Sequence, residues 1–475
     1  MNWDKLKFRR VFSKSMYKDL KLPLAEMTFT KDFVNDKRGD LYPIIEKDSA
    51  CIELIENNRY CVQNGTVERM FAQFFPYATY QISFSGLTGE CGFVFHLADK
   101  RAQLLCNKDS LLFFDGECEQ KTELKESPAC RTVIVSCRPG AFDVYLSSND
   151  KPDFLCTFRS DAFANSNEEK LFHKGFVSLL VSGTATVNSA CSYMDCGISQ
   201  ADIRPIRYEN GDVIFENGMV FLTLSVRMQE GGFQGIVSWT PSTSKFELVG
   251  ALFYDSGDGK WCGDVAASIL FNRKTGAWNL WVCSFAHQHI LGHAEFKGDP
   301  RFGVNVIDIS LMDKAGRNNS ITEFSGFEGD EDPDFYYNEQ EDKWYMAICR
   351  IDPSIKAYKY MFFRSDNPFE NYEFIGQGRD GAETGGSFAT VEGEKVFVCG
   401  NGFDKRANYR IYTREGMTEA KFDFDDGGFR GWGTIIPLTM GSRKRYFWLT
   451  FDRHNGSDYN WSYGNLYCFE AVTVD

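Results

Sequence analysis

Residues 330–350 have the sequence DEDPDFYYNEQEDKWYMAICR, in which an acidic segment stands directly before two apolar stretches. Three carboxylates, Glu331, Asp332 and Asp334, surround a single proline, and a polar turn then separates FYY from KWYMAICR. Short apolar stretches divided by polar turns are typical of β-strands. One copy of the pattern fits a surface loop as well as the rim of a functional site, so its recurrence along the chain decides the interpretation.

The apolar strand of this stretch recurs after residue 200. The five copies are FLTLSV from Phe221, WNLWVCSF from Trp278, KWYMAICR from Lys343, KVFVCGNG from Lys395 and RYFWLTFD from Arg445. Each follows a Gly- or Asp-rich loop with a short leading strand, and each is followed by another strand. A unit of three or four strands that repeats every roughly 50 to 65 residues is the pattern of a β-propeller. We therefore predict a five-bladed β-propeller over residues 199–475.

The first part of the chain has a different rhythm. Residues 28–198 contain short, irregularly spaced strands such as TYQISFSG and RTVIVSCR, which favour an antiparallel β-sandwich. In strand rhythm this segment resembles the concanavalin- and laminin-like jelly rolls. Residues 1–27 form an N-terminal extension, for which we expect a short basic helix and a linker. The whole chain is thus predicted to be all-β.

Composition excludes several classes of function. The net charge of −14 argues against nucleic acid as the main partner, because a phosphate backbone requires a basic face. No segment approaches the about 18 apolar residues of a membrane span, and the basic N-terminus lacks the apolar core of a signal peptide. The 15 cysteines are scattered and form no CxxC pair, so we expect reduced thiols in a cytoplasmic protein. The sequence leaves self-association into a homo-oligomer open.

The residues that lead into the innermost strand of each blade converge at one end of a propeller axis. Four blades carry an acid there, Asp202, Asp264, Asp332 and Glu383, and the fifth offers Trp432. Carboxylates that face one axis raise one another's pKa, so such a cluster indicates a metal site or acid/base chemistry. Hydrolysis of a glycosidic bond requires one protonated carboxyl group and a second carboxylate that is ionised.

These motifs resemble those of the five-bladed propeller glycoside hydrolases of families 32, 43 and 62. Those families use an Asp in blade one, an Asp in a DP motif in blade three and a Glu in blade four. This chain has Asp202 in ADIRP, Asp332 in EDPD and Glu383 in AETGG. The resemblance covers about 200–475. It implies a glycoside hydrolase without a cofactor, acting on a furanoside linkage, arabinofuranosyl or fructofuranosyl, in oligosaccharides.

The resemblance also implies a role for each acid. Asp202 would be the nucleophile of a retaining enzyme or the general base of an inverting one. Asp332 would stabilise the oxocarbenium-like transition state, and Glu383 would be the general acid.

Two departures from the family pattern leave the substrate open. The proline that usually follows the first aspartate is displaced to Pro205, and Glu331 stands where the fructan-cleaving group has an arginine. Asp264 is an additional acid that could bind sugar hydroxyls or replace Asp202.

Aromatic and basic residues near the acids are candidates for substrate binding. Trp261 and Trp432 could be platforms for sugar rings or could pack between blades. Arg204 could bind a sugar hydroxyl or carboxylate, or neutralise the acids.

The segment HQHILGH places three histidines, His287, His289 and His293, close together in the sequence. A metal site is one interpretation. We favour exposed or hydroxyl-binding histidines and expect no catalytic metal, while a structural calcium ion in the propeller channel is left open.

Two other functions fit the same folds. One is a non-catalytic carbohydrate-binding protein. The other is a glycoside phosphorylase or transglycosylase. A phosphorylase would need basic residues beside the acids, for which Arg204, Lys260 and Arg430 are candidates.

Overall fold

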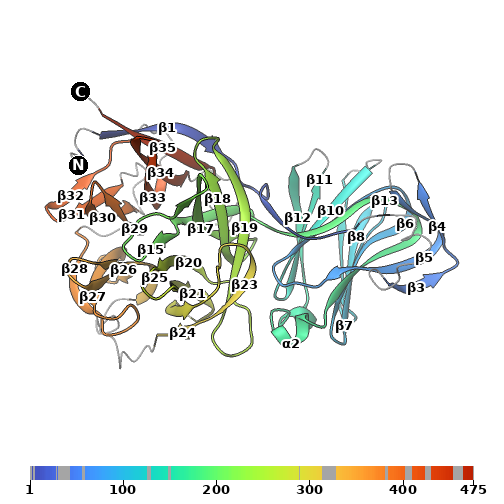
Figure 1. Ribbon diagram of the computed structural model, residues 1–475. Coiled ribbons are helices and arrows are strands. Elements are labelled where there is room, and N and C mark those ends of the chain that lie inside the picture. Colours follow the sequence, from blue (N-terminus) through green and yellow to red (C-terminus); the bar gives the residue numbers. More distant parts are fainter. Residues whose placement is uncertain are drawn as a thin grey trace. The chain divides into compact units, whose positions relative to one another are not determined.

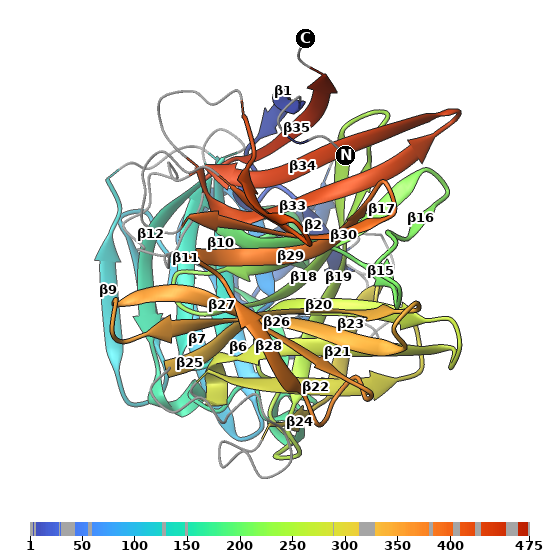
Figure 2. The same cartoon turned by 90° about the vertical axis from the view of Figure 1, so that its left-hand side faces the viewer.

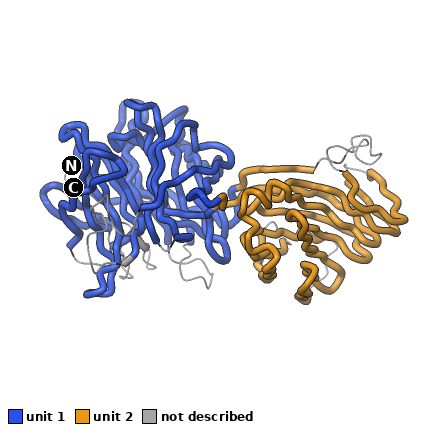
Figure 3. The backbone as a smooth tube through the Cα atoms, turned by 90° about the horizontal axis from the view of Figure 1, so that it is seen from below, with its two compact units in different colours: residues 1–20, 196–258, 262–475 blue, residues 21–195, 259–261 orange. Residues whose placement is uncertain are grey.

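The computed structural model describes most of the chain. The described residues are 3, 6–27, 29, 43–55, 59–125, 130–147, 151–287, 289–312, 328–379, 383–401, 409–422, 429–452 and 464–473. They form two compact units (Figure 3): unit 1 comprises Met1–Leu20, Cys196–Asp258 and Cys262–Asp475, and unit 2 comprises Lys21–Asp195 and Gly259–Trp261. The described helices are single turns: η2 (Asp161–Phe163), α2 (Glu169–Phe172) and η3 (Phe285–His287). The predicted all-β class is confirmed.

Unit 1 is a five-bladed β-propeller, as predicted (Figure 1). Blade one comprises β14 (Ser199–Pro205), β17 (Met219–Arg227), β18 (Gly232–Thr240), β19 (Lys245–Asp255) and β23 (Gly303–Asp308), with β16 (Phe215–Glu216) paired to β17. Blade two comprises β15 (Arg207–Tyr208), β20 (Val265–Asn272), β21 (Ala277–Ser284), β22 (Ile290–Phe296) and β24 (Ser310–Leu311). Blade three comprises β25 (Glu328–Asn338), β26 (Lys343–Asp352), β27 (Ala357–Ser365) and β28 (Glu373–Gln377). Blade four comprises β29 (Glu383–Val391), β30 (Glu394–Asn401), β31 (Arg410–Thr413) and β32 (Gly416–Glu419).

Blade five is built from both ends of the chain. It comprises β33 (Phe429–Met440), β34 (Arg443–Asp452), β35 (Leu466–Thr473) and β1 (Leu6–Lys14). The strand β1 pairs antiparallel with β35, and the two lie side by side in Figures 1 and 2. The basic helix expected near the N-terminus is therefore wrong for Leu6–Lys14, because this segment gains a complete strand partner that local sequence does not reveal.

The innermost strands β14, β20, β25, β29 and β33 contact one another in a closed ring. The five apolar copies found in the sequence are the second strands, β17, β21, β26, β30 and β34. Every residue of β21 is buried. A strand enclosed by neighbouring blades on both faces has no polar side, which explains why these strands are continuous apolar runs.

Unit 2 is one continuous antiparallel sheet of twelve strands. Its strands are β2 (Lys21–Glu26), β3 (Ile44–Asp48), β4 (Cys51–Ile55), β5 (Arg59–Gln73), β6 (Thr79–Leu97), β7 (Lys100–Cys106), β8 (Ser110–Phe114), β9 (Glu119–Glu123), β10 (Cys130–Arg138), β11 (Ala141–Ser147), β12 (Pro152–Arg159) and β13 (Phe176–Asp195).

The sheet of unit 2 folds over along its long strands. The first half of β6 pairs with β10 and its second half with β7. Gly89 lies opposite Gly183 at the bend, both with positive φ, and a Cβ on Gly89 would stand 2.1 Å from a backbone oxygen. Phe113 of β8 contacts Phe142 of β11 at 5.2 Å, so the two flanks face each other. This is the arrangement expected of an antiparallel sandwich, and jelly-roll connectivity stays a prediction.

The unit boundaries differ from the predicted domains 1–27, 28–198 and 199–475. Unit 2 begins at Lys21 and also takes Gly259–Trp261 from within the propeller sequence. Among the described residues no helix has the length and hydropathy needed to cross a membrane. All fifteen cysteines are free thiols. Cytoplasmic location and self-association stay predictions.

The closure of blade five can be tested at Phe8. Its ring is buried against Phe422 and Trp448, at centroid distances of 4.9 and 5.2 Å. We expect Phe8→Ala to lower the free energy of unfolding by about 3–4 kcal/mol, the usual cost of emptying a buried aromatic position. The measurement is urea denaturation. Val11→Ala in the same strand, where the side chain is 48% exposed, is the matched control and should change stability little. Equal effects of the two substitutions would contradict closure by β1.

Candidate active site

The innermost strands share an irregularity at one end of the propeller. All five lose pairing register with the second strand of their blade, in the segments Ala201–Arg204, Val265–Ser268, Glu331–Asp334, Thr384–Ser387 and Arg430–Thr434. In the first four blades one residue of the bulge has a left-handed backbone: Asp202, Ala266, Asp332 and Gly385, with φ between 50 and 61°. Such bulges redirect side chains and are frequent beside functional sites.

The bulges reveal which acids are structurally equivalent. Asp202 and Asp332 occupy the left-handed position itself, in blades one and three. Asp264 and Glu383 stand two residues earlier in their blades, where blade three has Asp330. In position Glu383 therefore corresponds to Asp264 and Asp330, and Asp332 corresponds to Asp202.

Asp202 and Asp332 are both buried. Asp202 Oδ2 accepts a hydrogen bond from Ser225 Oγ at 2.5 Å, and Arg227 lies 3.9 Å away. Asp332 Oδ2 accepts from the Gly385 N–H of blade four at 3.2 Å. Burial, followed by the negative charge of Asp332, raises the pKa of Asp202 to about 7. The two carboxylates thus interact across the axis.

Several buried polar atoms at this end have no hydrogen-bond partner among the described residues. They include Asp202 Oδ1, Asp264 Oδ2 and Arg204 Nη2. Burial raises the pKa of Asp264, whose other oxygen accepts from the Ala286 N–H at 3.2 Å. Buried polar groups are normally paired, so three orphans in neighbouring blades indicate a place where a ligand supplies the missing partners.

Asp330 and Glu383 are neutralised by arginines. Asp330 accepts from Arg350 Nε at 2.5 Å. Glu383 has no exposed surface and accepts from Arg410 Nη1 at 3.1 Å, from the Tyr412 hydroxyl and from the Tyr360 N–H at 3.2 Å. The Glu383 carboxylate lies between blades three and four, and it is fully occupied by protein partners.

Two buried thiols experience the charges of these acids. Burial raises the pKa of Cys283 well above its ordinary value, and the charges of four acids add to the effect: Glu331, Asp332, Asp264 and Asp202. The pKa of Cys349 is raised by burial and then by Asp332, Glu331 and Glu383. Acids of blades one to three therefore act on Cys283, and acids of blades three and four act on Cys349.

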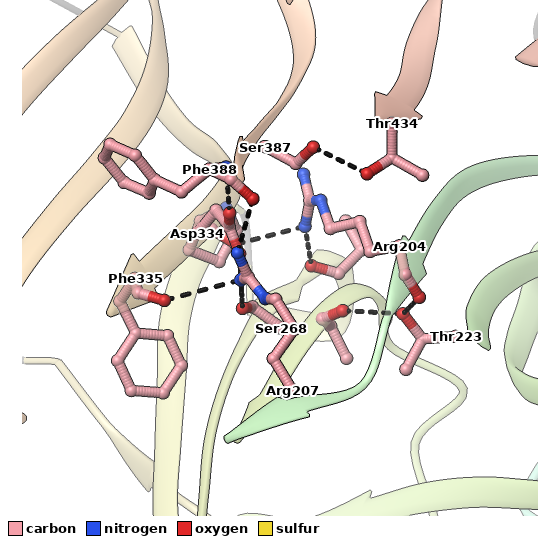
Figure 4. Close-up of polar contacts among 12 residues, drawn as sticks. Arg204, Arg207, Thr223, Ser268, Asp334, Phe335, Ser387, Phe388 and Thr434 are labelled. Atoms are coloured by element: carbon pink, nitrogen blue, oxygen red, sulfur yellow. Dashed lines mark hydrogen bonds and ion pairs between the residues drawn. The ribbon is translucent and has the colours of Figure 1, made fainter. Parts of the chain in front are cut away.

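A buried polar network forms the floor beneath the acids (Figure 4). Asp334 Oδ1 accepts from the Arg207 guanidinium and from Ser268 Oγ, and its Oδ2 accepts from the Phe388 N–H at 2.6 Å. Arg207 also donates to the Phe388 carbonyl at 2.6 Å. No role is predicted for Asp334 from the sequence. The signal in the sequence is spacing. A polar residue stands four positions after each of the acids Asp264, Asp330 and Glu383, and these polar residues are Ser268, Asp334 and Ser387.

Arg204 lies within this floor. Its Nη1 donates to the carbonyl oxygens of Ala266 at 2.9 Å and Pro333 at 3.0 Å, which joins blades one, two and three. The guanidinium groups of Arg204 and Arg207 are thus buried at the axis. This is the channel in which the sequence left the binding of a structural calcium ion open. The described residues contain no group of three potential metal ligands.

The two predicted aromatic platforms have different outcomes. The Trp261 ring belongs to unit 2, where it is 7% exposed and packs against Phe75 and Phe172 at 5.3 and 4.8 Å. The expectation that it offers a face to a sugar is not met, because packing covers the ring. Trp432 lies in β33, but its side chain is outside the described residues.

The three histidines of HQHILGH bind different partners. His287 contacts Ser284 Oγ at 2.8 Å and His289 contacts Glu331 at 2.9 Å. His293 stacks on Phe369, and burial lowers its pKa to about 4.

No family model matches the sequence, and no curated protein is similar to it. Solved structures that match part of the chain include the catalytic domain of a GH62 alpha-L-arabinofuranosidase from Coprinopsis cinerea, with 12% identity, 57% of this chain and 93% of that chain covered, and a TM-score of 0.36. An exo-beta-1,3-galactanase from Clostridium thermocellum gives 11% identity, 56% and 62% coverage and a TM-score of 0.37. The carbohydrate binding module CBM66 from Bacillus subtilis has 12% identity, with 32% of this chain and 94% of that chain covered, and a TM-score of 0.23. Scores this low assign no activity.

The network under the acids can be tested at Asp334. We expect Asp334→Ala to lower the free energy of unfolding by about 3–5 kcal/mol, because it leaves the buried Arg207 charge without its partner. Asp366→Ala removes the partner of Lys343 at the surface of the same blade and should leave stability almost unchanged. Urea denaturation measures both, and a small effect at Asp334 would rule out a structural role for the network.

The raised pKa of Asp202 can be tested through stability. Since its folded pKa of about 7 lies above the ordinary 3.8, the folded state holds the proton more tightly than the unfolded chain. The stability that the protonated Asp202 side chain contributes is fully present below pH 4, and it is lost as the pH rises to 7. We expect Asp202→Asn, which cannot ionise, to gain up to about 4 kcal/mol relative to the parent chain between pH 4 and 8. A pH-independent difference in urea denaturation would refute the shift.

Proposed function

We propose that the chain is a glycoside hydrolase that cleaves a furanoside linkage, arabinofuranosyl or fructofuranosyl, in oligosaccharides. The observation that carries the proposal is the set of orphaned atoms on Asp202, Asp264 and Arg204 beside the Asp332 carboxylate. A sugar ring brings several hydroxyls, each able to donate to a carboxylate or to accept from a guanidinium. One such ligand can satisfy all three atoms, which a ligand with a single polar group cannot do.

Asp202 is suited to proton transfer near neutral pH. A catalytic base works best when its pKa is close to the operating pH, and the pKa of Asp202 is about 7. In this proposal Asp202 takes the proton of an attacking water. The charge of Asp332 stabilises the oxocarbenium-like transition state from the neighbouring position.

The proton donor has two candidates. Glu383 is the donor implied by family resemblance, but Arg410, Tyr412 and the Tyr360 N–H enclose its carboxylate. To act, it would have to exchange one of these partners for the substrate. Asp264 has a pKa raised by burial and an oxygen without a partner, both of which suit a donor.

The enclosure of Glu383 also favours a second function, a carbohydrate-binding protein without turnover. A propeller whose acid is locked in ion pairs could bind a sugar at the remaining polar atoms. A phosphorylase has less support among the described residues. Lys260 lies in unit 2 beside Glu168, and Nη1 of Arg204 donates to backbone carbonyls, which leaves Nη2 of Arg204 as the basic donor beside the acids. The side chain of Arg430, the third predicted candidate, lies outside the described residues.

Aryl furanosides test the proposed activity. We expect the parent chain to release nitrophenol from nitrophenyl arabinofuranoside or fructofuranoside, and Asp332→Asn to lower kcat by about 10²–10⁴. The measurement is absorbance of released nitrophenol, with melting temperature as the check on folding. Binding of arabino- or fructo-oligosaccharides without release of product would instead establish the binding protein.

Comparison of substrates identifies the donor. A nitrophenolate leaves without protonation, whereas a sugar alcohol needs a proton. The variant that lacks the true donor should keep most of its activity on the aryl furanoside and lose it on the oligosaccharide. We expect this split for either Glu383→Gln or Asp264→Asn. Equal losses on both substrates in both variants would show that neither residue donates the proton.

A further inference from the structure

A cavity opens between blades three and four where β25 and β29 end, and its volume is about 830 Å³. Asp332 and the lining residue Asn338 are six residues apart on β25. At about 3.3 Å per residue, roughly 20 Å of strand separates these two residues. Tyr412 also lines the cavity, and its hydroxyl donates to Glu383, so the cavity is nearer to Glu383 than to Asp332. We call this cavity the tyrosine cleft.

Aromatic side chains from both blades line the tyrosine cleft. On blade three, Tyr336 stacks on Tyr345 with ring centroids 5.4 Å apart and planes at 14°. Phe362 of the same blade contacts Phe397 and Tyr412 of blade four at 5.1 and 6.0 Å. Aromatic walls of this kind bind ligands that present an apolar face and a polar edge.

Four carboxylates, of Asp212, Glu339, Glu341 and Glu394, line the cleft together with the two cations of Lys395 and Arg414, and several of these groups have fixed partners. Glu341 of blade three accepts from Arg414 of blade four at 3.0 Å, from Asn338 Nδ2 at 3.1 Å and from the Tyr345 hydroxyl. Lys395 donates to the Asn210 carbonyl and to Thr390 Oγ1. A charged ligand would have to compete with these pairs, whereas a neutral ligand leaves them intact.

Neutral hydrogen-bonding groups complete the lining. Gln340, Gln377 and Thr413 stand beside the aromatic rings. Amides and hydroxyls both donate and accept, as sugar hydroxyls do. The combination matches a sugar, whose ring has an apolar C–H face and a hydroxyl-bearing edge.

We propose that the tyrosine cleft binds a neutral oligosaccharide, at a site whose lining includes none of Asp202, Asp264 and Asp332. The proposal therefore holds whether or not these acids hydrolyse a glycosidic bond. The Tyr345 ring is the platform on blade three, and the hydroxyl of this residue is already engaged by Glu341.

The proposal is tested by calorimetric titration of the full chain with xylotriose, β-1,3-galactotriose and α-1,5-arabinotriose. At least one triose should bind. Tyr345→Ala should weaken that binding at least 10-fold, whereas Tyr345→Phe, which keeps the ring, should bind within 2-fold of the parent chain. Asp332→Asn should leave this binding unchanged. Failure of all three trioses to bind at 10 mM, or binding lost in Asp332→Asn and kept in Tyr345→Ala, would overturn the proposal.

Hydrogen exchange of the parent chain locates the ligand without any substitution. The binding triose should slow amide exchange in residues 336–345 and 409–416. Protection confined to residues 199–205 and 328–334 would assign the binding to the carboxylates and refute the cleft. This measurement also decides the matter if Tyr345→Ala fails to fold.

Discussion

The ion pair between Arg207 and Asp334 holds the propeller together at its axis. Blades of a propeller otherwise contact their neighbours around the ring. Arg207 belongs to β15 of blade two, which interrupts the sequence of blade one between β14 and β17. Asp334 belongs to blade three, and both residues bind the backbone of Phe388 in blade four. A buried ion pair costs desolvation, and hydrogen bonds to the remaining polar atoms offset that cost. Here Ser268 and the Phe388 backbone supply those bonds.

The closed floor determines the chemistry above it. Because side chains fill the axis, the carboxylates of Asp202 and Asp332 are held in a region with little water. Charges interact strongly there, which is why burial and one neighbouring carboxylate move the pKa of Asp202 so far. The bulges have the complementary role. A regular strand would alternate its side chains along the axis, and the bulge instead places an aspartate of blade one and an aspartate of blade three where their charges interact.

The repeat of apolar strands was sufficient to predict five blades, whereas a functional site at the leading acids stays a proposal. The equivalence of the acids was harder to predict. Three aspartates stand at every second position within five residues of blade three. Asp330 pairs with an arginine, Asp332 lies at the axis and Asp334 belongs to the floor. Only the bulge distinguishes these three environments. The paired state of Glu383 depends on Arg410 and Tyr412, whose strand is not adjacent to it in the sheet. Trp261 packs in unit 2 against Phe172 and Phe75, which stand 89 and 186 residues earlier in the chain. Local sequence carries no record of such distant partners.

The union of β1 with β35 also imposes an order on biosynthesis. In the chain β1 precedes unit 2 and the strands of blades one to four, whereas its partner β35 follows all of them. Unit 2 stands between the two in the sequence and pairs its strands internally, so it can fold while the ring is still open. Closure of blade five must wait until β35 is made, and until then β1 has no partner strand. An unpaired strand can pair with another chain, so a nascent propeller of this kind depends on protection from aggregation while its blades are synthesised.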